Sequence, residues 1–213
     1  YRPPPGLGEH SREILREGVE LVVRAWTEKG FTYKGKFYQV TEPCTLNQYP
    51  LQQPHPEIHI ACWSRGTLEM AARLGHHVMF TPFSAGMAFG GLGPAVAEFK
   101  RLAREAGHVK PLKTACSYFC AVAQDGRDAA RHRERLLLSL RGLVPAIPHD
   151  LSTAPPNLAY FVDIAGKIQT MQADQLGDGS IATGDAEKVT EILKRAEAAG
   201  IDEAILNVYF VRI

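Results

Sequence analysis

The stretch IHIACWSRGTLEMAARLGHHVMF, residues 58–80, decides the fold of this chain. A short apolar run at 58–62 predicts a buried strand, and a polar turn at 64–67 leads into a predicted helix at 68–74 that Gly75 ends. A second apolar run at 77–80 predicts another buried strand. Strand, helix and strand in this order are typical of a β-α-β unit in a parallel sheet.

The same alternation continues along the rest of the chain. We predict four buried strands, at 58–62, 77–80, 113–123 and 205–211. Helices are predicted at 11–27, with Ser11 as N-cap, and at 68–74, 94–106, 125–140 and 185–199. A hairpin-like turn is expected within 31–38, a Pro-rich connector at 41–56, a Gly-rich loop at 86–93, and an irregular segment at 141–179 whose part 158–175 can be helical.

Two architectures fit four βα units of this kind. They can form a small doubly wound sheet, or half of an eight-stranded barrel, which needs roughly 250 residues. The chain has only 213. It begins with Tyr1 and ends on a predicted strand without a covering element, so we expect a fragment or a processed chain.

Composition excludes several classes of protein. Apolar residues make up 45% and charged residues 22%, as in an ordinary globular domain with one sizeable core. The 24 Lys and Arg against 23 Asp and Glu give no electrostatic reason to expect a nucleic-acid partner, and no apolar run is long enough to cross a membrane. Four cysteines are too few for a disulfide scaffold, so we expect small buried thiols and a reducing, cytoplasmic compartment.

The turn between the first two strands is the best candidate for a binding site. The free N–H groups at the start of a helix make an anion site. Ser64 and Thr67 can add hydroxyl donors, Gly66 lets a ligand approach the backbone, and Arg65 can add charge, while the ring of Trp63 could flank a flat ligand. A phosphate suits this set. The alternative is that Ser64 merely caps a helix.

Other motifs carry less chemistry. Thr183-Gly184-Asp185, a strand-like piece before a helix start, is the second candidate for an anion site, but Asp185 would repel a phosphate and a simple helix cap is favoured. Gly90-Gly91-Leu92-Gly93 is read as a flexible loop. The pairs His55/His59 and His76-His77 lack a third ligand at zinc-like spacing, so we predict no metal site. The sequence contains no known nucleophile motif or P-loop, and the catalytic residues stay unknown.

Several phrases, in order, resemble the luciferase-like monooxygenases. They are EILREGVELVVRAWT at 13–27, FTYKGKFY at 31–38, QQPHPEIHIA at 52–61, AARLG at 71–75 and IATGDAEKV at 181–189. The resemblance implies an α/β fold of the (β/α)8 TIM-barrel type, with only about the last four βα units present, as one domain over 1–213. It also implies a lid, or an ordinary insertion, at 141–180.

The resemblance further implies a cofactor and a reaction. Reduced FMN would be held through its phosphate by Ser64 and Thr67, with backbone contacts near Ala61, Trp63 and Gly66, although the family pattern has an acidic residue where Trp63 stands. Reduced flavin and O2 would oxygenate a small organic substrate, with a flavin reductase or a reduced pyridine nucleotide as electron source. An F420-dependent oxidoreductase and a non-catalytic flavin-binding remnant are the alternatives, and we expect a homo-oligomer.

Overall fold

The computed structural model describes residues 7–144 and 159–208. Contacts divide the described residues into two compact units, one of residues 7–58 and one of the residues from 59 onward. The expectation of a single domain over 1–213 stays a prediction. No described helix is both long and apolar enough to span a membrane.

The first unit consists of a long helix and a hairpin. Helix α1 covers Leu7–Thr27, and strands β1 (Phe31–Lys34) and β2 (Gln39–Cys44) pair antiparallel. The expected hairpin is present, but its turn lies at 35–38 and its second strand begins after the predicted stretch 31–38. Ser11 lies inside α1, so its prediction as N-cap was wrong. Because α1 begins at Leu7, Glu9 lies in its first turn, at the positive end of the helix dipole, which favours acidic residues. The predicted connector starts later than expected, because β2 takes up 41–44.

One buried carboxylate closes the hairpin turn onto α1. Glu17 is only 3% exposed and accepts three backbone hydrogen bonds, from the N–H groups of Lys36 (3.0 Å), Phe37 (2.9 Å) and Tyr38 (2.7 Å). Burial by itself would raise the pKa of Glu17, but these three donors outweigh it and lower the pKa. A Cβ atom at Gly35 would overlap the Glu17 carboxylate, so glycine is required for this close approach.

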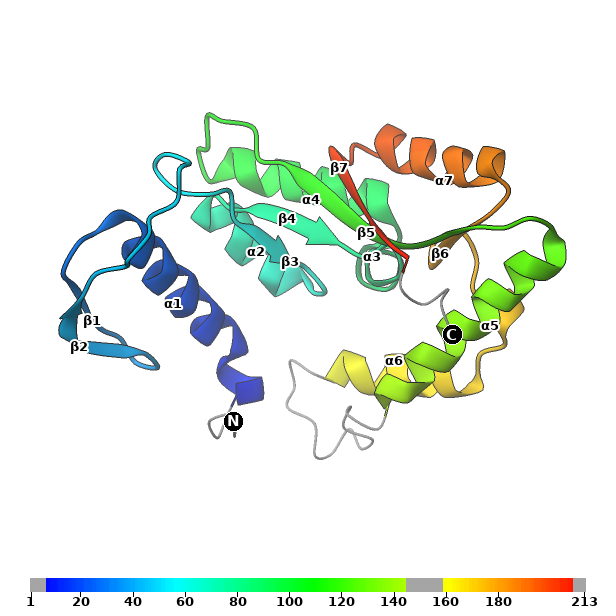
Figure 1. Cartoon of the computed structure of the whole chain (residues 1–213), viewed down its shortest axis with the longest axis horizontal. Helices are drawn as coiled ribbons and strands as arrows, with labels where there is room; N and C mark the ends of the chain where they lie inside the picture. Colours follow the sequence, from blue (N-terminus) through cyan, green and yellow to red (C-terminus); the bar gives the residue numbers. More distant parts are fainter. Residues whose placement is uncertain (1–6, 145–158, 209–213) are drawn as a thin grey trace. The chain divides into compact units, whose positions relative to one another are not determined.

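The second unit is built on a five-stranded parallel sheet (Figure 1). Its strands are β3 (His59–Ala61), β4 (His77–Phe80), β5 (Thr114–Val122), β6 (Ile181–Gly184) and β7 (Glu203–Asn207). The four predicted strands are present in their described parts, while 209–211 lie outside the described residues. Strand β6 was missed as a member of the sheet, because four residues ending in glycine carry little periodicity.

Strand β5 is the longest and holds the sheet together. Its residues 115 and 116 pair with both β4 and β7, which therefore flank it on opposite edges, and its residues 119–122 pair with β6. Among the described strands, β7 pairs with β5 alone, and Ile205 and Leu206 on it are 50% and 45% exposed. The sheet is therefore left open at β7, as expected for part of a barrel.

Helices connect the strands and cover the sheet. They are α2 (Arg65–Leu74), α3 (Pro82–Phe89), α4 (Leu92–Glu105), α5 (Gly126–Leu143), α6 (Ala159–Thr170) and α7 (Ala186–Ala198), with a 3-10 turn at Ala173–Gln175. Helix α6 and this turn lie in the stretch 158–175 that can be helical. An apolar cluster that includes Leu136, Ile164 and Ile168 packs α6 against α5.

The predicted Gly-rich loop at 86–93 was wrong over most of its length. Thr81 is the N-cap of α3 and Pro82 occupies the first helical turn, both favourable positions, so the helix continues through Gly86 to Phe89. Only Gly90 and Gly91, with φ of 83° and 139°, interrupt the chain before α4 begins.

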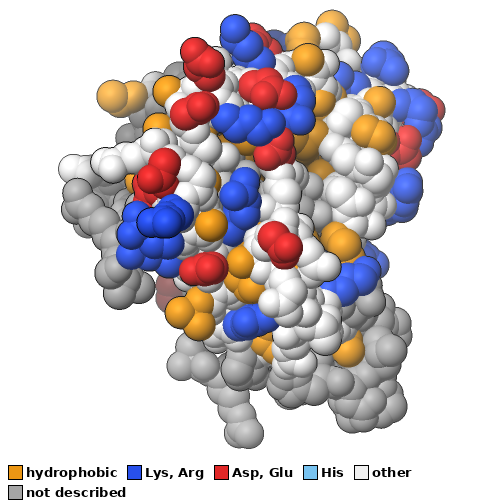
Figure 2. Space-filling view, turned by 90° about the vertical axis from the view of Figure 1, so that its right-hand side faces the viewer, with side chains coloured by type: hydrophobic (Ala, Val, Ile, Leu, Met, Phe, Trp, Pro, Cys, Tyr) orange, Lys and Arg blue, Asp and Glu red, His pale blue; other side chains and the backbone are white. Residues whose placement is uncertain are grey.

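Charges on the surface are mixed in sign. Figure 2 shows one face of the protein, on which Lys and Arg side chains lie beside Asp and Glu. Ion pairs along helices, such as Arg131–Asp128 at 2.9 Å, are one source of this mixture.

Substituting Glu17→Gln should loosen the hairpin of the first unit. Glutamine offers one carbonyl oxygen where the carboxylate offers two, so the N–H groups of 36–38 lose acceptors. We expect faster hydrogen exchange at these amides and a lower melting temperature. Glu42→Gln, at an exposed carboxylate on β2, is the matched control; equal exchange in both variants would show that Glu17 does not close the turn.

Candidate functional site

The turn after β3 has the geometry of a capped helix start. Ser64 is the N-cap of α2, and its Oγ accepts a hydrogen bond from the Thr67 N–H (3.4 Å) and lies 3.1 Å from Thr67 Oγ1. The Arg65 guanidinium lies 5.4 Å from the centre of the Phe89 ring, which connects this turn to α3. First-turn N–H groups, two hydroxyls and one cation are thus gathered at the carboxyl end of β3.

The turn after β4 repeats this arrangement. Thr81 is the N-cap of α3, and its Oγ1 accepts from the Ser84 N–H at 3.3 Å. Ser84 is 2% exposed, and its hydroxyl lies 2.7 Å from Thr81 Oγ1 and donates to the Thr81 carbonyl at 3.0 Å. Strands β3 and β4 are parallel neighbours, so both helix starts meet at the same edge of the sheet.

A pocket of about 260 Å³ lies between the start of α2 and one face of α3. Its polar residues are Ser64, Arg65 and Ser84. Its apolar residues are Trp63, Met87, Ala88 and Ile164. A phosphate suits the first group, because it finds the Ser64 hydroxyl, the Arg65 guanidinium and the positive end of the α2 dipole there. No carboxylate is among these lining residues, so nothing in the lining opposes an anion.

The structure brings some of the predicted site residues together and not others. Trp63 and Ser64 line the pocket, and Thr67 is joined to it by its hydrogen bonds with Ser64. Gly66 lies in the first turn of α2, and Ala61 ends β3 with an exposed side chain; neither is part of the lining. Their role in cofactor binding stays a prediction.

The half of the pocket formed by α3 was missed. Ser84, Met87 and Ala88 line it, and the expectation of a loop at 86–93 hid them. The sequence does contain an indication: Thr81 followed by Pro82 is typical of a helix start directly after the strand 77–80.

Three of the cysteines, His77 and Asp185 are buried or hydrogen-bonded within the fold. Cys62, Cys116 and Cys120 are buried, and burial raises the pKa of the first two thiols to about 12 and about 11, which makes them poor nucleophiles. His77 accepts a hydrogen bond from the Lys113 N–H at its Nδ1 (2.9 Å). Asp185 caps α7 through the Lys188 N–H (2.8 Å), as predicted.

Comparison with known families agrees with this geometry. The family model described as luciferase-like monooxygenase matches residues 8–203. This chain belongs to the luciferase-like monooxygenase family. Its fold is therefore part of the (β/α)8 barrel of that family, as the sequence resemblance implied.

Individual relatives of this luciferase-like chain use different cofactors. An FMNH2-dependent dimethylsulfone monooxygenase of Pseudomonas putida is 30% identical over 125 residues, which are 58% of this chain and 32% of the relative. A solved F420-dependent secondary alcohol dehydrogenase has a TM-score of 0.67 at 18% identity, with 99% of this chain and 61% of that chain covered. The monooxygenase RslO1 of Streptomyces bottropensis has a TM-score of 0.62 at 23% identity, with 93% and 54% covered.

The chain spans about a third of the length of this curated relative and 54–61% of these two solved structures. At such low identities the solved structures support the fold alone.

Substituting Thr81→Ala should destabilise the α3 wall of the pocket. The N-cap hydrogen bond to Ser84 is lost, and loss of such a cap costs about 1 kcal/mol. Urea denaturation of the protein should show this loss in the free energy of unfolding. Thr81→Ser keeps a capping hydroxyl and should stay close to the unsubstituted protein; equal losses in both variants would contradict a capping role.

Proposed function

We propose that this chain is the phosphate-anchoring part of an FMN-dependent monooxygenase, in which reduced flavin and O2 oxygenate a small organic substrate. One observation carries the proposal: the start of α2 and one face of α3 line a single pocket, whose polar part suits a phosphate and whose apolar part suits the remainder of a cofactor. The membership of the luciferase-like family supports it.

The residues of the pocket fit the phosphate end of FMN. Ser64 and Thr67 offer hydroxyl donors, and Arg65 offers a positive charge. The first N–H groups of α2 lie at the positive end of its helix dipole, which favours an anion. Ser64 and Thr67 already hydrogen-bond each other, so the two hydroxyls are positioned before a ligand arrives. Such pre-organisation lowers the entropic cost of binding.

The chemistry itself belongs to the cofactor, since a bound reduced flavin supplies the reaction with O2. The residues described here would bind and orient it. Ser64, Thr67 and Arg65 fix the phosphate, while Trp63, Met87 and Ile164 form an apolar wall that excludes water from this side of the cofactor. Ile164 comes from α6, within the segment 141–180, and its position in the lining supports the proposal that this segment acts as a lid. Catalytic residues are not assigned.

The electrons would come from a separate flavin reductase or from a reduced pyridine nucleotide. Three buried thiols without a disulfide among the described cysteines favour a reducing, cytoplasmic compartment. The open edge of β7 favours pairing with another strand, which could come from another part of the whole protein or from a second copy in a homo-oligomer.

An F420-dependent oxidoreductase is the second candidate. The F420-dependent alcohol dehydrogenase is similar over 99% of this chain, and a phosphate in F420 would suit the same start of α2. Titration with FMN and with F420, followed by assays of O2 uptake and of hydride transfer, would separate the two. A non-catalytic flavin-binding remnant would bind FMN but would show no substrate-dependent O2 consumption.

The phosphate site can be tested with two flavins that differ only in the phosphate. The double substitution Ser64→Ala and Thr67→Ala should weaken FMN binding by about 1–3 kcal/mol, because two donors are lost. Riboflavin, which lacks the phosphate, should bind both proteins equally, as measured by fluorescence titration.

Thr190→Ala, at an exposed hydroxyl that donates to the Ala186 carbonyl within α7, is the control and should keep the FMN affinity. If the double variant loses FMN and riboflavin affinity in the same proportion, the turn does not contact the phosphate.

A further inference from the structure

A second hollow lies on the other side of α3. It is a groove of about 310 Å³ between α3, the start of α4 and α7, and helices α4 and α7 lie on the same side of β5 (Figure 1). Pro82 and Gly86 of α3 line it, whereas Ser84, Met87 and Ala88 of the same helix line the candidate cofactor pocket. The groove is thus separate from the proposed phosphate site.

The floor of the groove contains a buried phenol without a partner. Tyr118 on β5 lines the groove and is 4% exposed, and none of the described residues hydrogen-bonds its hydroxyl. A buried polar group left unsatisfied costs about 1–3 kcal/mol. Burial raises the pKa of Tyr118 to about 12, so the phenol carries its proton at neutral pH and can donate it.

The start of α4 adds a second set of donors to the same groove. The N-cap of this 14-residue helix is Gly91, which provides no side-chain cap. Leu92 and Gly93 occupy the first turn, where N–H groups have no partner within the helix, and both residues line the groove. The positive end of the helix dipole favours an anion here.

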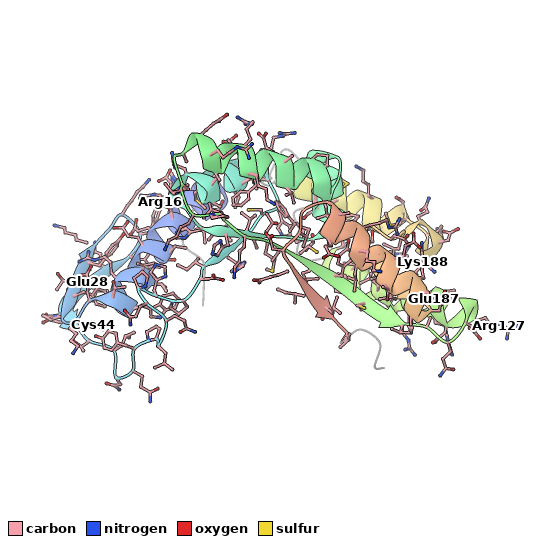
Figure 3. All side chains as sticks on the ribbon, turned by 90° about the horizontal axis from the view of Figure 1, so that it is seen from above. Arg16, Glu28, Cys44, Arg127, Glu187 and Lys188 are labelled. Atoms are coloured by element: carbon pink, nitrogen blue, oxygen red, sulfur yellow. The ribbon has the colours of Figure 1, made fainter. Side chains whose placement is uncertain are left out.

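The charges at the rim of the groove balance one another. Arg195 pairs with Asp178, and both line the groove. Lys188, near the start of α7 (Figure 3), pairs with the same carboxylate at 3.0 Å. Glu191 pairs with Lys188 at 3.2 Å and with Arg195 at 3.9 Å, so the two cations and two carboxylates of this network are neutral together. The Asp178 carboxylate in the lining would repel a dianion such as phosphate more strongly than a monoanion.

The rest of the lining is apolar or small. Leu92 and Ile192 offer aliphatic surface, and glycine or alanine at 86, 93, 196 and 199 leaves space beside it. A Cβ atom at Gly86 would meet no atom within 4 Å, and one at Gly93 would meet only Ala199, at 4.0 Å. A flat apolar body therefore fits between α3 and α7.

We propose that this groove binds a small organic monocarboxylate, whose carboxylate accepts a hydrogen bond from Tyr118 near the start of α4 and whose apolar body lies against Leu92 and Ile192. The site is additional to the proposed flavin function and shares only α3 with it. A ligand there would contact the face of α3 opposite the cofactor pocket.

The test is calorimetric titration of the whole protein with sodium benzoate. We expect saturable binding with the same affinity in the presence and absence of saturating FMN, and weaker binding of benzyl alcohol, which has the ring without the charge. Tyr118→Phe keeps the ring and should weaken benzoate binding about tenfold, as expected for one lost hydrogen bond to a charged group. This variant removes an unpaired buried group, so it should fold normally.

A second pair of variants tests the location. Gly86→Leu should fill the groove and abolish benzoate binding, whereas Gly142→Leu, at a glycine of α5 that also has open space, should leave it unchanged. The proposal is overturned if benzoate gives no saturable heat, if Tyr118→Phe binds it as tightly as the unsubstituted protein, or if FMN displaces it. The last outcome would place benzoate in the cofactor pocket.

Discussion

The backbone pairing of β5 with three other strands is the interaction on which the rest of the second unit depends. Thr114 at its start is fully buried and tied to the approach to β7: its N–H and hydroxyl donate to Asp202 Oδ2 at 2.8 and 2.9 Å, and its carbonyl accepts from the Asp202 N–H at 2.8 Å. These bonds fix the register of β7 against β5. Strand β4 pairs with the opposite edge of β5, so the register between them also determines the position of Thr81, which follows β4 directly.

Helix α3 separates two hollows beside that sheet. It is only eight residues long, and its opposite faces carry different residues: Ser84 and Met87 face the cofactor pocket, and Pro82 and Gly86 face the groove above Tyr118. A ligand bound on one face of α3 can therefore affect the hollow on the other face only by moving the whole helix. The caps at Thr81 and Gly90 resist such movement, so any coupling between the two hollows would act through these ends.

The local parts of this structure could be predicted from the sequence, and the non-local parts could not. The turn around Ser64 follows from a strand, a hydroxyl and a glycine that are adjacent in the chain, and Asp185 at the start of α7 follows in the same way. Strand β6 is recognisable only by its pairing with β5, some 60 residues earlier. The pocket needs α3, whose glycine at 86 is typical of loops but is stabilised in a helix by Thr81 and Pro82 before it.

The residues that line the pocket indicate which part of the proposed function this chain would perform. Every described donor for the phosphate lies at the ends of β3 and β4, and the lining beyond them is apolar, without a described acid or base. Binding energy at a group remote from the reacting atoms serves to orient those atoms. Under the proposed function this chain would contribute affinity and orientation, and the groups that act on the substrate would come from other parts of the barrel. A chain of this kind could retain flavin binding after losing its reaction, because the two depend on different residues.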